Sequence, residues 1–110
     1  MKIKRRKKNK QGLVVGVAWY RPEQWQRLHE ISDDADKLEK THEAWRELAE
    51  SNLAKFRLHG LSPRKIDVDV EELLAWCNEH ELRVDGKARA QYVSEKARKL
   101  HEGDRRFLLR

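Results

Sequence analysis

The stretch GLVVGVAWY, residues 12–20, decides the fold. It is short, rich in β-branched and aromatic residues, and bounded by a glycine and by Pro22, which is the pattern of a β-strand. Its apolar residues do not alternate strictly with polar ones, so we expect both faces of the strand to be covered. Gly16, inside the strand, predicts either a bulge or the close approach of another backbone.

The stretch KIDVD, residues 65–69, alternates polar and apolar side chains and predicts a second, half-buried strand. The chain between the two strands is long enough for parallel pairing, and antiparallel pairing is equally compatible with it. Two strands alone are only marginally stable. We therefore expect helices to cover this small sheet, or a second copy to extend it as a homodimer joined through an edge strand.

The remaining chain has the apolar spacing of four helices, expected at residues 22–32, 33–59, 70–81 and 87–101. Asp33 and Asp34 are expected to cap the second helix, and Asp69 the third. Gly60 is a natural stop for the second helix. The side chains expected to face inward are Leu38, Trp45, Ala49, Leu53 and Phe56 of the second helix, Val70, Leu73, Leu74, Trp76 and Cys77 of the third, and Ala90, Val93, Ala97 and Leu100 of the fourth.

These elements predict an α+β fold that is mostly helical, with the order β-α-α-β-α-α and a small two-stranded sheet covered by helices. We expect a basic N-terminal arm at residues 1–11, one α+β domain at 12–103 and a C-terminal tail at 104–110. The strand-helix-helix opening over residues 12–60 resembles ribbon-helix-helix repressors in element order. That resemblance implies pairing of N-terminal strands in a dimer, and it assigns no base-reading residue.

The positive charge is concentrated at the N-terminus. The chain has a net charge of +6, while residues 11–110 carry 18 basic and 19 acidic side chains. Such a run of cations binds phosphate backbones without reading the sequence, although a solubility tail would have the same composition. The residues expected to contact nucleic acid are Lys2, Lys4, Arg5, Arg6, Lys7, Lys8 and Lys10.

The rest of the chain is also polarised. Residues 30–50 hold eight acidic and three basic side chains, whereas residues 83–110 hold nine basic and four acidic ones. Opposite poles of this kind steer partners or pair with each other. They support an alternative function, a protein–protein regulatory or assembly module with an acidic and a basic face. An acidic protein is then the alternative partner to nucleic acid.

Three groups of residues are candidates for catalysis or metal binding. Cys77 and His80 share one helix face, but a buried core cysteine is the simpler interpretation. Asp67 and Asp69, with Glu71 and Glu72, could bind a divalent cation, but helix capping explains them without a metal. His42 is expected at the boundary of the core. We therefore expect no catalytic residue, metal or cofactor, and a small enzyme or ligand-binding domain with a pocket near His42, His80 and Asp67 is the less favoured reading.

The expected function is a small, non-enzymatic accessory or binding protein that associates with nucleic acid through its arm. One cysteine excludes an internal disulfide and indicates a reducing, cytoplasmic location. The basic start resembles a secretory signal, but Arg21-Pro22-Glu23 follows the apolar run where a small-x-small cleavage site would stand. That apolar run, residues 13–20, is also far shorter than the roughly 20 residues of a membrane span.

Overall fold

The computed structural model describes residues 13–100, so the predicted basic arm and C-terminal tail lie outside the described residues. The protein is α+β and mostly helical, and the order of its elements confirms the predicted β-α-α-β-α-α with two short 3-10 turns added. The elements are β1 (Val14–Trp19), η1 (Pro22–Gln24), α2 (Trp25–Ile31), η2 (Ala35–Lys37), α3 (His42–Leu58), β2 (Ser62–Asp67), α4 (Val70–Glu79) and α5 (Gly86–Leu100).

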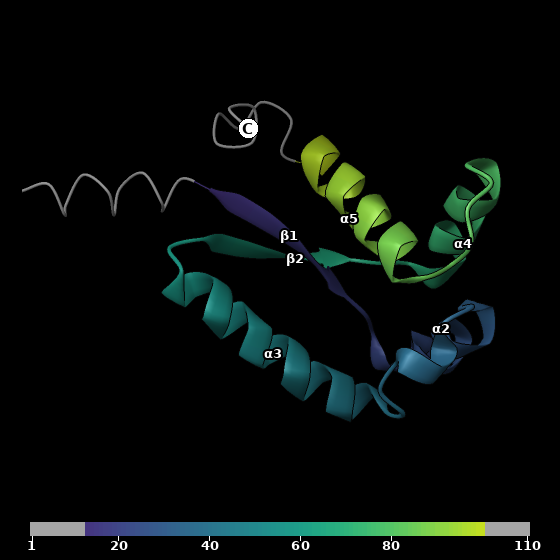
Figure 1. The fold of residues 1–110 in the computed structure, drawn as a ribbon, viewed down its shortest axis with the longest axis horizontal. Helices are drawn as coiled ribbons and strands as arrows, with labels where there is room; N and C mark the ends of the chain where they lie inside the picture. Colours follow the sequence, from purple (N-terminus) through teal and green to yellow (C-terminus); the bar gives the residue numbers. More distant parts are fainter. Residues whose placement is uncertain (1–12, 101–110) are drawn as a thin grey trace, which may run out of the picture.

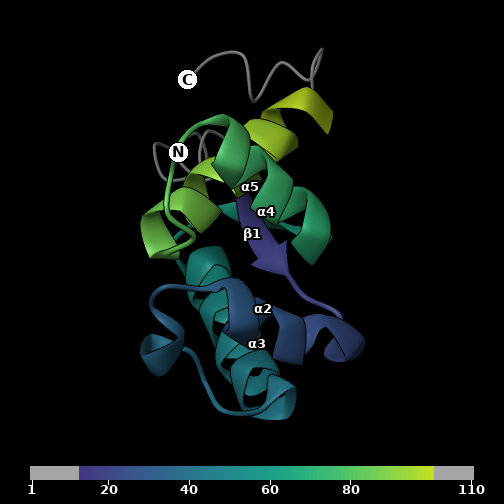
Figure 2. The same ribbon diagram turned by 90° about the vertical axis from the view of Figure 1, so that its right-hand side faces the viewer.

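The two strands form a parallel sheet, in continuous register from Val14 opposite Ser62 to Trp19 opposite Asp67. Parallel pairing follows from the length of α3, because this helix carries the chain back to the end of the sheet where β1 begins (Figure 1). Figure 2 shows α3 on one side of β1, with α4 and α5 on the other. Both faces of β1 are therefore covered, as its unbroken apolar sequence predicts.

Gly16 lies where α5 crosses β1. A Cβ atom added at this position would lie 2.8 Å from Cβ of Ala97 and 3.3 Å from Cγ1 of Ile66. The register of the sheet runs through Gly16 without a bulge. Of the two predicted roles, a bulge is absent, and the close approach is to the Ala97 side chain of α5.

The core fills the space between the sheet, α2, α4 and α5. Its largest fully buried side chains are Leu28, Ile66, Leu73, Val68, Val70 and Cys77, while Leu53 of α3 is fully buried outside this cluster. A second set of contacts is aromatic: the Trp45 ring lies 5.1 Å from Trp19, 5.3 Å from Tyr20 and 5.5 Å from Trp25, centroid to centroid. This aromatic cluster fastens the start of α3 to the end of β1.

The predicted start of the second helix is wrong. α3 begins at His42, and its cap is Thr41, whose hydroxyl accepts a hydrogen bond from Ala44 N at 3.1 Å. Asp34 instead accepts hydrogen bonds from α5, at 3.0 Å from Gly86 N and 2.8 Å from Arg89 Nη2. The local sequence predicts that Asp34 caps the nearest helix, but in the fold its carboxylate binds α5, which is distant in the sequence.

The inward face of the fourth helix is also partly wrong. Val93 and Ala97 are buried as predicted, but Ala90 is exposed and Leu100 is 63% exposed. Tyr92 is buried instead, with its ring 5.5 Å from Trp76 of α4. The reason is that α5 packs against β1 and α4 at once, whereas a single apolar stripe assumes one partner.

Candidate nucleic-acid interface

One end of the molecule contains no acidic side chain among the described residues. It is made of three segments, residues 13–18, 51–66 and 96–100, and we call it the cationic end. All 17 acidic residues of the described chain lie outside these segments. The basic residues of the cationic end are Lys55, Arg57, Arg64, Lys65, Lys96, Arg98 and Lys99.

The topology brings these segments together. Both strands begin at this end, where Ser62 N donates a 2.8 Å hydrogen bond to Leu13 O. α3 ends just before β2, and the last turns of α5 reach the same end because Ala97 packs directly on Gly16 (Figure 1). Arg64 is the register partner of Gly16, so its side chain lies on the α5 face of the sheet.

Some basic side chains of the cationic end have ion-pair or hydrogen-bond partners, and others have none among the described residues. Lys65 is paired, 3.8 Å from Glu50 and 4.3 Å above the Trp19 ring, and Lys96 Nζ donates to Asp67 O at 2.6 Å. Lys99 lies 4.0 Å from Glu95, at the limit of an ion pair, and an exposed pair of this kind contributes little. Of the bases at this end, those with no ion-pair partner within residues 13–100 are Lys55, Arg57, Arg64 and Arg98. These are the cations available to an anionic ligand.

Of the eight basic residues elsewhere in residues 13–100, four are paired with carboxylates, namely Arg21, Arg27, Arg83 and Arg89. The other four, Lys37, Lys40, Arg46 and Lys87, have no ion pair within the described residues. Arg83 Nε lies 2.8 Å from Asp33, and Arg89 binds both carboxylate oxygens of Asp34, at 2.9 and 2.8 Å. Hydrogen bonds from Arg89 hold the pKa of Asp34 below its usual value. The predicted acidic and basic poles therefore do pair with each other, here through Asp33 and Asp34. The basic pole is thus neutralised at Arg83 and Arg89, while Lys87 and Arg98 have no ion-pair partner within the described residues.

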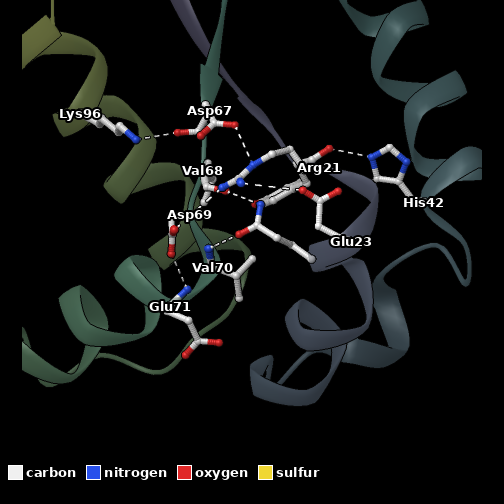
Figure 3. A network of polar contacts seen from close by, with 11 residues as sticks. Arg21, Glu23, His42, Asp67, Val68, Asp69, Val70, Glu71 and Lys96 are labelled. Carbon is white, nitrogen blue, oxygen red and sulfur yellow. Dashed lines mark hydrogen bonds and ion pairs between the residues drawn. The ribbon is translucent and has the colours of Figure 1, made fainter.

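The acidic pair Asp67 and Asp69 lies beside a cation supplied by the chain itself (Figure 3). Arg21 Nε lies 3.3 Å from Asp67, and Arg21 Nη2 lies 3.8 Å from Asp69. Asp69 also caps α4, accepting from the amides of Glu71 and Glu72 at 3.0 and 3.1 Å. No group of three or more His, Cys, Asp or Glu side chains that could hold a metal ion is found in residues 13–100. The capping role predicted for Asp69 is confirmed.

Gln24 was missed by sequence reasoning, yet it joins two distant parts of this region. Its Nε2 donates to Val68 O at 2.9 Å, and its Oε1 accepts from Val70 N at 2.7 Å. The amide thereby completes the backbone hydrogen bonding where the chain leaves β2 for α4. A glutamine on a short turn carries no sequence signal for this role.

The structure separates Cys77 from His80. Cys77 is completely buried, and burial raises the pKa of its thiol. His80 is exposed and stacks on Trp76, with ring centroids 4.2 Å apart. His42 lies at the core boundary, where its Nε2 donates to Tyr20 O at 2.6 Å. Cys77 thus packs in the core, His80 stacks on a tryptophan, and His42 completes the backbone hydrogen bonding of Tyr20.

The seven cations of the predicted arm, residues 2–10, lie outside the described residues. β1 begins at Val14, so the arm enters the fold at the cationic end. No helix within residues 13–100 has the length and apolar character needed to cross a membrane. In comparisons with protein-family models, curated proteins and solved structures, no match to this chain was found.

Proposed function

We propose that this protein is a small, non-enzymatic accessory protein that binds nucleic acid, with the N-terminal arm and the cationic end together contacting the phosphate backbone. The observation that supports this proposal is the place where the arm joins the fold. The described part of the chain has 15 basic and 17 acidic side chains. Four bases without an ion-pair partner among the described residues, Lys55, Arg57, Arg64 and Arg98, lie in acid-free segments at the end of the fold that the seven-cation arm joins.

For nucleic-acid binding, the distribution of charge over the surface matters more than the net charge of the protein. A uniformly mixed surface with two excess acids would repel a polyanion weakly from every side. Here the three segments of the cationic end carry no acidic residue, and the two acids that contact its bases, Glu50 and Glu95, lie beside Lys65 and Lys99. A phosphate backbone at that end therefore meets mainly positive side chains. Lysine and arginine contacts to phosphates supply affinity and orientation but carry no base information. We therefore expect weak discrimination between sequences.

The test is a salt titration of binding to fluorescent duplex and single-stranded oligonucleotides, read by anisotropy. If roughly five arm cations reach phosphates, log K against log salt on duplex falls with a slope near −4 to −5. Deleting residues 1–10 should flatten this slope towards the contribution of the cationic end alone.

A pair of charge-reversal variants separates the cationic end from net charge. R98E/K99E reverses two exposed bases at the cationic end, and K37E/K40E reverses two exposed bases among the acidic residues. Both variants change the net charge by the same amount. The first is expected to weaken binding by about tenfold at 0.1 M salt, and the second by less than about threefold.

Two results would contradict the proposal. One is absence of binding by the full-length protein at about 50 mM salt, where phosphate contacts are strongest. The other is equal loss of affinity in the two charge-reversal variants, because net charge alone would then explain the binding. In the first case an acidic protein surface becomes the ligand to test.

A further inference from the structure

The outer edge of β1 has unpaired backbone groups. Leu13 O and Trp19 O accept hydrogen bonds from Ser62 N and Val68 N, at 2.8 and 3.1 Å, so the odd-numbered residues of β1 direct their peptide groups towards β2. Because this direction alternates along a strand, Val14, Gly16 and Ala18 direct their N–H and C=O groups away from β2. Within residues 13–100 no hydrogen bond beyond the β1–β2 ladder reaches them.

The outer edge of β2 is protected in ways that β1 lacks. Pro63 has no N–H to donate, Lys65 places a charge on the strand, and Asp67 O already accepts from Lys96 Nζ. Proline, lysine and covered carbonyls are the usual devices that prevent edge pairing. The β1 sequence VVGVAW has neither a charge nor a proline, so among residues 13–100 the open edge of this sheet is that of β1.

An apolar groove of about 400 Å³ accompanies the open edge. β1 forms its floor, and helices from both faces of the sheet form its walls. Because α3 and α5 lie on opposite faces, a groove lined by both must run around the free edge of β1. Its lining includes Gly16, Ala18, Trp45, Phe56 and Ala90, and also Arg89, whose guanidinium is paired with Asp34.

We infer that a second copy of this chain occupies this groove by pairing its own β1 antiparallel to the first. A two-fold axis between identical neighbouring strands of one sheet makes them antiparallel. With Gly16 opposite its counterpart, Val14 of each copy faces Ala18 of the other. All three outward-facing residues of each strand then form ladder hydrogen bonds, and the sheet becomes four-stranded in the order β2-β1-β1-β2. Sheets of three or more strands escape the marginal stability of an isolated pair.

The residues around the groove suit contact with a second copy of this chain. The flank of α3 beside Trp45 carries Ala44, Leu48, Ser51 and Asn52, and Leu48 is 49% exposed. Lys55, one turn beyond Ser51, is the first charged residue on this flank. Interface centres are depleted of charge in the same way. A stable dimer buries about 800 Å² on each partner, more than a six-residue strand supplies, so this flank must contribute. On the other wall, Gly86 and Ala90 are small enough to let the two α5 helices approach.

The first test compares amide exchange within β1 at several protein concentrations. It is done without nucleic acid at about 0.3 M salt, which screens repulsion between the two arms. The Val15 and Val17 amides face β2 and should be protected at every concentration. The Gly16 and Ala18 amides should become protected only as sedimentation shows the dimer forming. This result does not depend on nucleic-acid binding, so it can fail without affecting the proposed function.

Two matched variants give the second test. Ala90→Glu places a carboxylate on the exposed groove wall, and Ala75→Glu places one on the exposed surface of α4. Both keep a good helix former, so both should fold. Ala90→Glu should be a monomer at concentrations where wild type and Ala75→Glu are dimers.

Three outcomes would overturn the inference. One is a wild-type monomer up to the highest soluble concentration. Another is a dimer that Ala90→Glu leaves intact. The third is concentration-independent protection of Gly16 and Ala18 that disappears on deletion of residues 101–110, since the chain's own tail would then cover the edge.

Discussion

Gly16→Ala is the substitution that most directly probes the contact between β1 and α5. The new methyl group would lie 2.8 Å from Cβ of Ala97, closer than carbon atoms approach without repulsion, and Ala97 Cβ is fixed to the helix backbone. Overpacking of this kind costs about 1–3 kcal/mol. Replacing a strand glycine by alanine returns about 0.5–1 kcal/mol through the unfolded state. We expect a net loss of about 1–2 kcal/mol in the free energy of unfolding.

Ala97→Gly provides the second arm of a double-mutant cycle. By itself it should cost about 1 kcal/mol in helix propensity and about 0.8 kcal/mol for the buried methyl group. In the double variant the incoming methyl group finds the space that Ala97 leaves. The double variant should therefore be less destabilised than the sum of the single variants, by at least 0.5 kcal/mol, the scale of coupling between residues in contact.

The assay is urea unfolding followed by tryptophan fluorescence, with Gly86→Ala as the control. A Cβ at Gly86 would meet its nearest neighbours, Arg89 Nη2 and Asp34 Oδ2, only at 3.7 Å, which is ordinary contact. Gly86→Ala should be neutral or stabilising by up to about 1 kcal/mol. The reasoning is refuted if Gly16→Ala and Gly86→Ala have the same stability, or if the cycle is additive.

Two further predictions concern buried ionisable groups. Cys77 should react slowly with a thiol reagent in the folded protein and rapidly in denaturant, because burial raises its pKa and removes access; rapid labelling of folded protein would contradict its place in the core. The pKa of Asp34 is lowered in the fold by hydrogen bonds from Arg89, so its contribution to stability is present above the ordinary aspartate value of 3.8 and is lost as pH falls through the lower folded value. Asp34→Asn should cost about 1.5–3 kcal/mol at neutral pH and reduce the loss of stability on acidification, and an unchanged acid profile would contradict this assignment.

Local sequence patterns predicted what depends on neighbouring residues. The strand at residues 12–20, the cap at Asp69 and the burial of Cys77 each follow from the chemistry of a short segment. The direction of strand pairing does not, because it depends on how far α3 carries the chain back. Both parallel and antiparallel sheets therefore remained compatible with the sequence.

Misassigned residues are those whose partner is distant in the sequence. Asp34 has the chemistry of an N-cap for the helix after it, but Arg89 and Gly86, more than 50 positions away, form stronger contacts with it. Ala90 was expected in the core because the contact of α5 with α4 was not foreseeable from its own sequence. The cationic end could not be predicted from local sequence either, because its three segments lie far apart in the chain and meet only in the folded state.

Titration of a short duplex oligonucleotide into isotope-labelled protein, read by amide chemical shifts, tests most directly where nucleic acid binds. The surface charge predicts that shift changes within the described chain concentrate in residues 13–18, 51–66 and 96–100, and that they weaken as salt is added. Shift changes centred instead on α2 and α4, or spread evenly over the surface, would contradict the assignment of the cationic end as the nucleic-acid interface.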